Sequence, residues 1–258
     1  MGFLEWICLT IPSVRELELN ELKWWSGWAT VKRLGRDAYV LTSGRFQEPF
    51  FNRASFLECS AVPDHIAAAE KLLLGLPLSP TVTVNQNCSP ARRMLARLGY
   101  RASEIMIVMA STKQHKIAGN PDVKVSKTSL KTVNEWASAY LLSFYGNQKL
   151  LSPTVGIARR LVGKRSATLL EAKLDGAVAG VMAIFRTPGL AGIYCVGTVP
   201  RFRRKGVAGS LLRRASEVAT AESRLMTLQT LRSDHVEDFY KKRGFAELYQ
   251  KCFMEKEN

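Results

Sequence analysis

The sequence has 258 residues, of which 47% are hydrophobic, and its formal net charge at pH 7 is +15. This composition can bury a core, which excludes a disordered chain, and the length suits one large domain or two of about 100–150 residues. The strong positive charge indicates an anionic partner such as nucleic acid, an acidic lipid or a polyphosphate ligand.

The N-terminal segment has no basic region ahead of its apolar residues, so we expect no signal peptide. No apolar run reaches the ~18 residues that a membrane span needs, so we expect no membrane insertion. The five cysteines are odd in number, none stands in a CxxC pair, and there are three histidines. We therefore expect no disulfide framework and no metal site, and predict a cytoplasmic protein.

Near the N-terminus, Trp24, Trp25 and Trp28 fall mostly on one face of a helical segment. We expect them to pack in the core or against the second half of the chain. The elements predicted next are a helix at 63–77, a strand at 81–87, and a short helix followed by an apolar strand at 93–111.

A polar stretch at 111–125 contains glycine, asparagine and proline in succession, which interrupt regular structure. It predicts two domains, 1–115 and 119–258. The second alternates strands and helices, which indicates an α/β fold (α+β mixed sheet). Its predicted strands are 123–128, 166–176, 177–189, 190–200, 225–232 and 247–256, and its predicted helices are 129–146, 149–163, 206–221 and 236–244.

The two halves end alike, in a short helix, a glycine followed by an aromatic residue, and an apolar strand. Gly99 thereby corresponds to Gly244, 145 positions further on. A repeat of this length indicates duplication rather than a solenoid. The halves differ in charge: 1–118 has 14 Lys+Arg against 10 Asp+Glu, net +4, and 119–258 has 23 against 12, net +11. We therefore assign the anionic partner to the second half.

The stretch RFRRKGVAG at 201–209 gathers cations and glycines at the start of a predicted helix. A helix N-terminus has unpaired N–H groups and a partial positive charge, so cations placed there oppose the helix dipole unless an anion lies among them. Glycines leave room for an anion to reach the backbone. The stretch therefore predicts a phosphate-binding loop, although it has neither the GxxxxGK[ST] nor the GxGxxG pattern.

The pattern Arg203-x-x-Gly206-x-Ala208 resembles the pyrophosphate-binding loop of the GNAT superfamily of acyl-CoA-dependent N-acyltransferases, Gln/Arg-x-x-Gly-x-Gly/Ala. The stretch FYKKRGF at 239–245 is similar to that family's second signature, an aromatic-Tyr pair before Gly-Phe. The resemblance is closest over 190–256 and reaches back to residue 122. Residues 1–115 have no such loop and resemble a degenerate copy, as in tandem members of the superfamily.

The resemblance implies that acetyl-CoA is the acyl donor. Its pantetheine arm would bond the backbone of a strand that separates from its neighbour, at Val196, Gly197 and Thr198. The residues implied to bind its phosphates are Arg203, Arg204, Lys205, Gly206, Val207, Ala208 and Gly209. Ser233 stands where many members have an asparagine that contacts the cofactor. This departure weakens the expected contact, so we do not count Ser233 among the cofactor-binding residues.

Amine attack on a thioester needs an oxyanion donor and a proton for the leaving thiolate, for which a weak acid suffices. The resemblance implies that Tyr240 is the acid that protonates the leaving thiolate and that a backbone N–H of 196–198 donates a hydrogen bond to the oxyanion. Glu171, an acid among apolar strand residues, is the first candidate for a general base, although it could equally be a solvated edge acid or water could serve. At the position matching Tyr240 the first half has Leu95, so we expect that half to be catalytically silent.

The leading hypothesis is thus an N-acetyltransferase acting on a primary amine by direct attack on acetyl-CoA. The alternatives are a basic nucleic-acid-binding protein, given the charge of +15, and a CoA-binding module without catalysis. The acceptor is left open as a small molecule, a peptide or an RNA-linked amine. A homodimer, or a pseudo-dimer of the two halves, is a further expectation.

Overall fold

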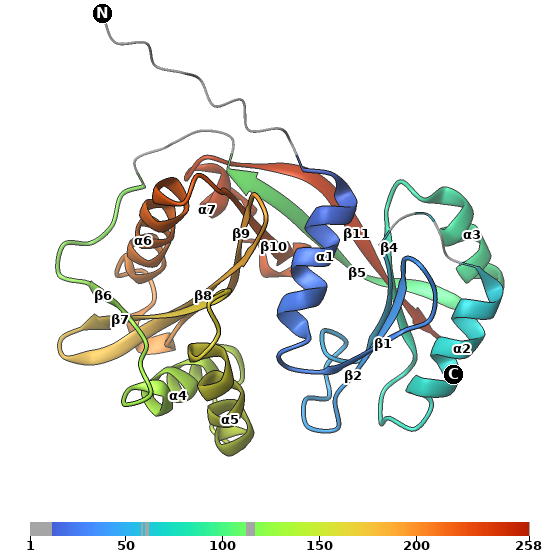
Figure 1. The fold of residues 1–258 in the computed structure, drawn as a ribbon, viewed down its shortest axis with the longest axis horizontal. Helices are drawn as coiled ribbons and strands as arrows, with labels where there is room; N and C mark the ends of the chain where they lie inside the picture. Colours follow the sequence, from blue (N-terminus) through green and yellow to red (C-terminus); the bar gives the residue numbers. More distant parts are fainter. Residues whose placement is uncertain (1–11, 58, 60–61, 112–116, 258) are drawn as a thin grey trace, which may run out of the picture.

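The computed structural model describes residues 12–57, 59, 62–111 and 117–257, whose strands form one mixed sheet in the order β1-β2-β3-β4-β11-β5-β10-β9-β8-β7-β6 (Figure 1). The strands are β1 Thr30–Arg33, β2 Ala38–Thr42, β3 Arg53–Phe56, β4 Thr81–Asn85, β5 Tyr100–Ser111, β6 Lys124–Lys127, β7 Ala167–Leu174, β8 Ala177–Thr187, β9 Leu190–Thr198, β10 Leu225–Leu231 and β11 Phe245–Lys256. The α-helices are α1 Val14–Trp25, α2 Pro63–Leu73, α3 Ser89–Arg97, α4 Val133–Phe144, α5 Leu151–Val162, α6 Val207–Ala221 and α7 Glu237–Lys241, and two 3-10 turns are η1 Pro200–Phe202 and η2 Arg232–Asp234.

The predicted α/β layout of the second half is confirmed, with differences at the ends of elements. Helix α4 begins four residues later than expected, at Val133, because residues 129–132 close a turn in which the Ser129 N–H donates to Thr132 Oγ1. Such local hydrogen bonds compete with helix formation. Helix α7 has only five residues, because Gly244 follows it with a φ of +83°.

The pairing of β5 with β11 shows the internal repeat directly. Tyr100 lies opposite Lys256, and Ser111 lies opposite Phe245. Exchanging every residue for its counterpart 145 positions away converts the first of these pairs into the second. The two strands are therefore related by a pseudo-two-fold axis, which confirms the duplication that the sequence predicts.

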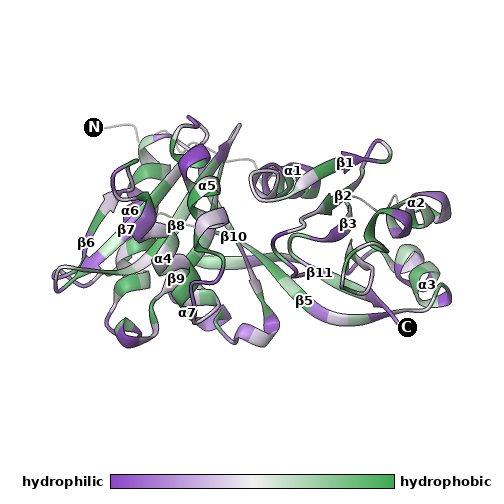
Figure 2. Cartoon of the chain, turned by 90° about the horizontal axis from the view of Figure 1, so that it is seen from below, coloured by the Kyte–Doolittle hydropathy of each residue, from purple (hydrophilic) through white to green (hydrophobic). Residues whose placement is uncertain are grey.

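The two halves exchange strands across this axis. Strand β5 of the first half lies between β11 and β10, and β11 of the second half lies between β4 and β5. Figures 1 and 2 show both strands running from one half to the other. The sheet is thus continuous across the predicted domain boundary at 115–119, which stays a prediction because 112–116 lie outside the described residues.

Two glycines show which helix covers which face of the second half. A Cβ at Gly180 would lie 2.6 Å from Val207 of α6. Gly197 of β9 pairs with Val181, the residue that follows Gly180 on β8. A Cβ at Gly197 would lie 2.8 Å from Ser143 of α4. Because successive side chains alternate between faces, α6 lies on one face and α4 on the other.

Helix α1 and the turn that follows it join the two halves through their tryptophans. The Trp24 ring stacks on Tyr194 of β9 with centroids 5.0 Å apart, and Trp28 lies 5.1 Å from Tyr140 of α4. Trp25 contacts Phe51 at 5.2 Å. The expectation that these rings pack at the interface with the second half is confirmed.

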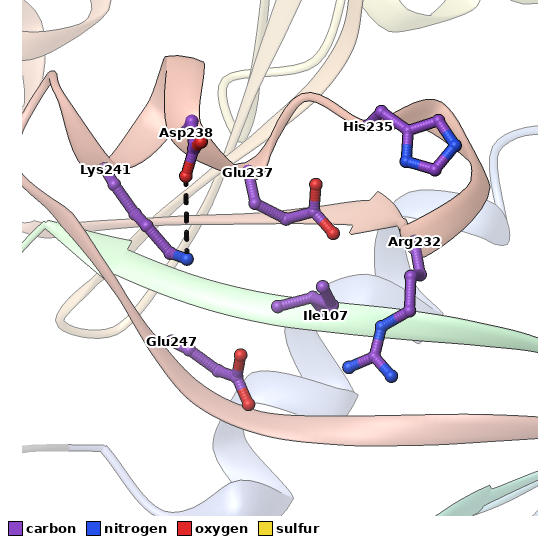
Figure 3. Close-up of a pocket in the computed structure, with 7 residues that line it drawn as sticks. All are labelled: Ile107, Arg232, His235, Glu237, Asp238, Lys241 and Glu247. Atoms are coloured by element: carbon purple, nitrogen blue, oxygen red, sulfur yellow. Dashed lines mark ion pairs between the residues drawn. The ribbon is translucent and has the colours of Figure 1, made fainter.

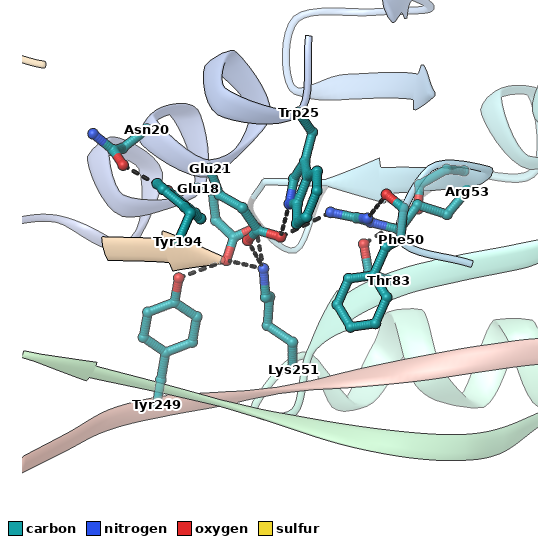
Figure 4. A network of polar contacts seen from close by, with 11 residues as sticks. Glu18, Asn20, Glu21, Trp25, Phe50, Arg53, Thr83, Tyr194, Tyr249 and Lys251 are labelled. Carbon is teal, nitrogen blue, oxygen red and sulfur yellow. Dashed lines mark hydrogen bonds and ion pairs between the residues drawn. The ribbon is translucent and has the colours of Figure 1, made fainter. Parts of the chain in front are cut away.

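A buried ionic network lies under α1 (Figure 4). The Lys251 ammonium contacts the carboxylates of Glu18 and Glu21, and Arg53 Nη2 lies 2.8 Å from Glu21 Oε1. The Tyr249 hydroxyl donates to Glu18 at 2.5 Å. All five side chains are buried, so the two cations and two carboxylates balance one another away from water.

One expectation from the cysteines is wrong: Cys59 and Cys88 form a disulfide. Their separation of 29 residues matches no short motif, and the fold brings them together by placing the start of α2 beside the start of α3. The cytoplasmic assignment rested partly on the cysteine pattern and stays a prediction. In the part of the chain that the structure describes, no helix is long and apolar enough to cross a membrane.

Candidate functional site

Strands β9 and β10 separate at the position that the sequence predicts. They pair in parallel only from Leu190–Leu225 to Ile193–Leu228, although both strands continue further. Cys195, at a φ of +53°, interrupts the ladder between β9 and β8 at the same level. The backbone of Val196, Gly197 and Thr198 therefore has no partner on β10, and some of its N–H and C=O groups are available to a ligand.

The basic loop lies at the end of β9. Arg204 and Gly206 have φ values of +64° and +77°, and Gly206 is the N-cap of α6, where no side chain caps the helix. Arg204, Lys205 and Gly206 are exposed. The 15-residue helix thus begins without a side-chain cap at an exposed glycine that follows exposed cations, an arrangement that favours a bound anion, although Val207 and Gly209 of its first turn are buried.

The two glycines of the loop also make room for the linker, and their predicted contact with a phosphate stays a prediction. A Cβ at Gly206 would lie 2.9 Å from Cβ of Asn120, and a Cβ at Gly209 would lie 3.0 Å from the Ala118 carbonyl oxygen. The Asn120 amide also donates to the Lys205 carbonyl at 2.9 Å. Because neither glycine has a side chain, the segment that links the two halves can pack directly on the start of α6.

The three loop cations are not equivalent. Arg203 Nε lies 3.4 Å from the Thr198 carbonyl oxygen, and its Nη2 lies 3.3 Å from that of Ser143, so this side chain ties the loop to β9 and α4. Lys205 lies over the Phe202 ring, with Nζ 5.7 Å from its centroid. The exposed Arg204 and Lys205 are the side chains best placed to meet a phosphate.

Tyr240 lies on α7 with only 8% of its surface exposed, packed edge-on against Phe239 at 5.2 Å and Phe245 at 6.0 Å. Burial raises the pKa of its phenol well above the usual 10, and Asp234 raises it further, while Arg243 lowers it. The phenol therefore keeps its proton at neutral pH and is a donor rather than a base.

This raised pKa predicts how the rate of a reaction that uses Tyr240 as its acid would depend on alkaline pH. If Tyr240 acts as the acid, kcat should not fall between pH 8 and about 10, because the phenol stays protonated there. The measurement is a kcat profile over this range with a saturating acceptor. A fall that persists in the Tyr240→Phe variant would come from another group, whereas a fall that the variant abolishes would contradict the assigned pKa direction.

Glu171 is buried rather than solvated, with 2% exposed. Its Oε2 accepts from the Thr128 hydroxyl at 3.3 Å, and Lys173 lies 3.8 Å from its Oε1. It lies opposite Val181, which lies opposite Gly197. Glu171 is thus two strands from β9, about 10 Å away, and would reach an amine there only through water. Its role as a base stays a prediction.

Figure 3 shows a pocket of about 310 Å³ beside α7, which Tyr240 does not line. Glu237, Asp238 and Glu247 give it acidic character, and Asp238 pairs with Lys241 at 3.8 Å. The pseudo-two-fold counterpart is a pocket beside α3, in which Arg92 and Arg93 replace the first two acids. Arg232 and Lys241 also line the pocket beside α7, so its three carboxylates face two cations and it has no excess of positive charge to bind the cofactor's phosphates.

Sequence reasoning missed the residues that the two halves bring together over β9. These are Glu48, from the loop between β2 and β3, and Tyr140 and Tyr145 at the end of α4. Burial and the nearby Glu48 carboxylate raise the pKa of Tyr145, whose ring centroid lies 6.2 Å from that of Tyr140. No motif marks these positions, because they meet only when the first half packs against the second.

Comparison with known proteins agrees with this geometry. Residues 132–245 match the model of the acetyltransferase (GNAT) family, and this part of the chain belongs to that family. No curated protein sequence matches the chain significantly.

Several solved structures share the fold over nearly the whole chain. A GCN5-related N-acetyltransferase from Kribbella flavida has 13% sequence identity and a TM-score of 0.68, over 96% of this chain and 97% of that one. A tandem GNAT protein from the clavulanic acid biosynthesis pathway has 14% identity and a TM-score of 0.59, over 95% and 96%. A functionally unknown conserved protein from Staphylococcus epidermidis has 15% identity and a TM-score of 0.67, over 89% and 95%. The whole chain, and not only residues 132–245, thus shares its fold with these structures.

Proposed function

We propose that the protein is an N-acetyltransferase that transfers the acetyl group of acetyl-CoA to a primary amine at the second half of the chain. The observation that carries this proposal is the meeting of three features at one place. The strands β9 and β10 separate, α6 begins uncapped at the exposed Gly206, and exposed cations stand beside it. Family membership of 132–245 supports it.

The separated strand can bind the pantetheine arm through Val196–Thr198, and the start of α6 the pyrophosphate. An N–H of this strand would donate to the thioester oxygen as negative charge develops. The neutral amine nitrogen attacks the carbonyl carbon, the C–S bond breaks, and the nitrogen loses a proton to solvent or a base. Tyr240 gives its proton to the leaving thiolate, whose conjugate thiol has a pKa of about 8.5.

We propose that the first half does not bind a second acetyl-CoA. The equivalent of the basic loop lies between β3 and α2, where Cys59 is tied to Cys88 and the described residues include no cation. Leu95, the counterpart of Tyr240, is fully buried in the apolar core of that half. We therefore expect one acetyl-CoA per chain in a binding titration.

Replacing Tyr240 by phenylalanine tests the proposed chemistry. The ring packing is kept and only the proton donor is lost, so we expect kcat to fall roughly 100-fold with acetyl-CoA affinity unchanged. The assay follows thiol release with a panel of amines, peptides and polyamines, and calorimetry measures acetyl-CoA binding to the full chain. Tyr39→Phe, which removes a phenol from β2, is the matched control.

An unchanged kcat in Tyr240→Phe would assign the proton to water or to another side chain. Acetyl-CoA binding without acetylation of any acceptor would favour a non-catalytic CoA-binding module. A full chain that fails to bind acetyl-CoA would refute the proposed function.

A further inference from the structure

Glu48 carries a buried carboxylate oxygen that lacks a partner. Its Oε2 is inaccessible to solvent and accepts no hydrogen bond from the part of the chain that the structure describes. The same described residues provide no ion pair to this carboxylate within 4.0 Å. Burying half of a carboxylate without a partner is costly, so a fold that keeps it there has a use for it or a ligand that satisfies it.

The loop that carries Glu48 is held in place by its own hydrogen bonds. Asn52 donates to the carbonyl oxygens of Phe46 at 2.6 Å and of Glu48 at 3.2 Å, and its Oδ1 accepts from the Ser43 N–H at 2.6 Å. Arg53 also donates to the Phe50 carbonyl, as Figure 4 shows. The position of Glu48 is therefore set by the fold rather than by the reach of a flexible loop.

This loop reaches from the first half into the second. The buried ring of Phe46 lies 5.6 Å from Trp28, which in turn contacts Tyr140 of α4. The pseudo-two-fold counterpart between β8 and β9 is only the short turn at 188–189. The longer loop of 43–52 is thus an insertion of the first half that extends over α4.

The loop of Glu48 lies beside the residues of α4 that pack on the end of β9, where the proposed function places the acetyl group. Tyr145, near Glu48, follows α4, and a Cβ on Gly197 would lie 2.9 Å from the ring of Phe144, the residue before it. Cys195 of β9 is close enough to raise the pKa of both Tyr145 and Tyr140. The carboxylate and the separated strand therefore face the same region.

The side chains around this carboxylate are aromatic and uncharged. Burial raises the pKa of Tyr140, Tyr145 and the Cys195 thiol, so all three are neutral at pH 7. The rings of Tyr140 and Phe144 lie 5.0 Å apart. Burial also raises the pKa of Glu48, and a bound cation would favour its ionised form. A carboxylate beside aromatic rings is the chemistry that binds an ammonium group, through an ion pair and cation–π contacts.

We propose that Glu48 receives the ammonium group of the acceptor, which loses one proton to solvent before its neutral nitrogen attacks, so that the degenerate first half completes the acceptor site and the substrates are cationic amines with an apolar or aromatic portion. This inference rests on the proposed function for the position of the acetyl group. It gives the first half a role in specificity, since the catalytic second half has no equivalent of the loop at 43–52.

A quaternary ammonium compound tests this binding site without catalysis. Benzyltrimethylammonium carries a fixed positive charge and a ring but cannot be acetylated, so its binding to the full chain with bound CoA is measured by calorimetry. We expect binding by the wild type and a loss of about 10-fold or more in affinity in Glu48→Gln. Glu48→Asp keeps the charge and should retain more affinity than Glu48→Gln.

The matched control is Glu70→Gln, which removes a carboxylate that accepts from Tyr100 at 3.0 Å on the far side of the first half. It should bind the probe as the wild type does. In the same variants, KM for cationic amines should rise about 10-fold or more in Glu48→Gln, with acetyl-CoA affinity unchanged.

Three results would overturn the inference while leaving the proposed function intact. One is that the wild type binds acetyl-CoA and acetylates amines but does not bind the probe. Another is that Glu48→Gln binds the probe and acetylates cationic amines with unchanged constants. A third is that Glu70→Gln lowers the affinity for the probe as much as Glu48→Gln does. Failure of acetyl-CoA to bind would instead refute the proposed function itself.

Discussion

Replacing Lys251 by methionine should lower the free energy of unfolding by about 3–5 kcal/mol and the melting temperature by about 10 °C. The ammonium is 2% exposed and contacts both Glu18 and Glu21. Without it, two buried carboxylates face one guanidinium, that of Arg53, and one negative charge is left uncompensated. Thermal and urea unfolding of the purified variant measure the loss.

The loss should shrink as the pH falls. Lys251 and Arg53 hold the pKa of Glu21 below its usual value, against burial, which would raise it. Burial raises the pKa of Glu18 even in the wild type. In the variant both folded-state pKa values should lie above the unfolded one, so the cost is full at pH 8 and is relieved as protonation neutralises a carboxylate toward pH 5.

A double-mutant cycle separates charge from packing. Glu18→Gln combined with Lys251→Met leaves the neutral pair of Glu21 and Arg53, so the double variant should be more stable than the sum of the two single losses predicts. Strict additivity, or a loss that does not change between pH 8 and pH 5, would show that Lys251 acts through its hydrocarbon stem rather than its charge.

Much of this fold could be predicted from local patterns. Alternating apolar residues and turn residues located the strands β7, β8 and β9 and the helix α6 within a few residues of their observed bounds. The repeat of Gly99 at Gly244 predicted the duplication, which the register of β5 against β11 confirms. These features could be predicted because each depends on neighbours in the sequence or on an internal copy.

What the sequence could not show depends on contacts between distant segments. Strand exchange between the halves leaves no local trace, because β5 and β11 are apolar strands whichever partners they take. Cys59 met Cys88, and Glu48 met Tyr145, only through the packing of whole elements. The buried network of Lys251 also contradicts the usual rule that charged residues stay exposed, and no pattern in the sequence marks it.

Only the part of the site that is contiguous in sequence could be predicted. The basic loop and the strand before it are contiguous in sequence, and the structure brings Val196–Thr198 and Arg203–Gly206 to one end of the sheet. The general base was sought by residue type alone, and Glu171 lies two strands away. The side chains over β9 come from two halves, so no single segment could contain them.

The variant Arg204→Glu/Lys205→Glu should weaken acetyl-CoA binding by about 30- to 1,000-fold. Each exposed contact to a phosphate contributes about 0.5–1 kcal/mol, and reversing its charge roughly doubles the change because attraction becomes repulsion. Both side chains are exposed, so the fold should be unaffected. At position 204 one unbranched residue replaces another, so the backbone cost of a φ of +64° stays similar.

The matched control is a charge reversal on the same helix but away from its start. Arg214 is partly exposed and pairs only with Glu217, at 2.9 Å, among the ion pairs that the structure describes. Arg214→Glu should change acetyl-CoA affinity by less than about threefold, the effect expected of net charge screened over a distance. Calorimetry at two salt concentrations distinguishes the sites, since only the wild type and the control should lose affinity steeply as salt rises. If the loop variant bound acetyl-CoA as the control does, the phosphates would lie elsewhere, and the start of α6 would be only a solvated basic turn on which the linker packs.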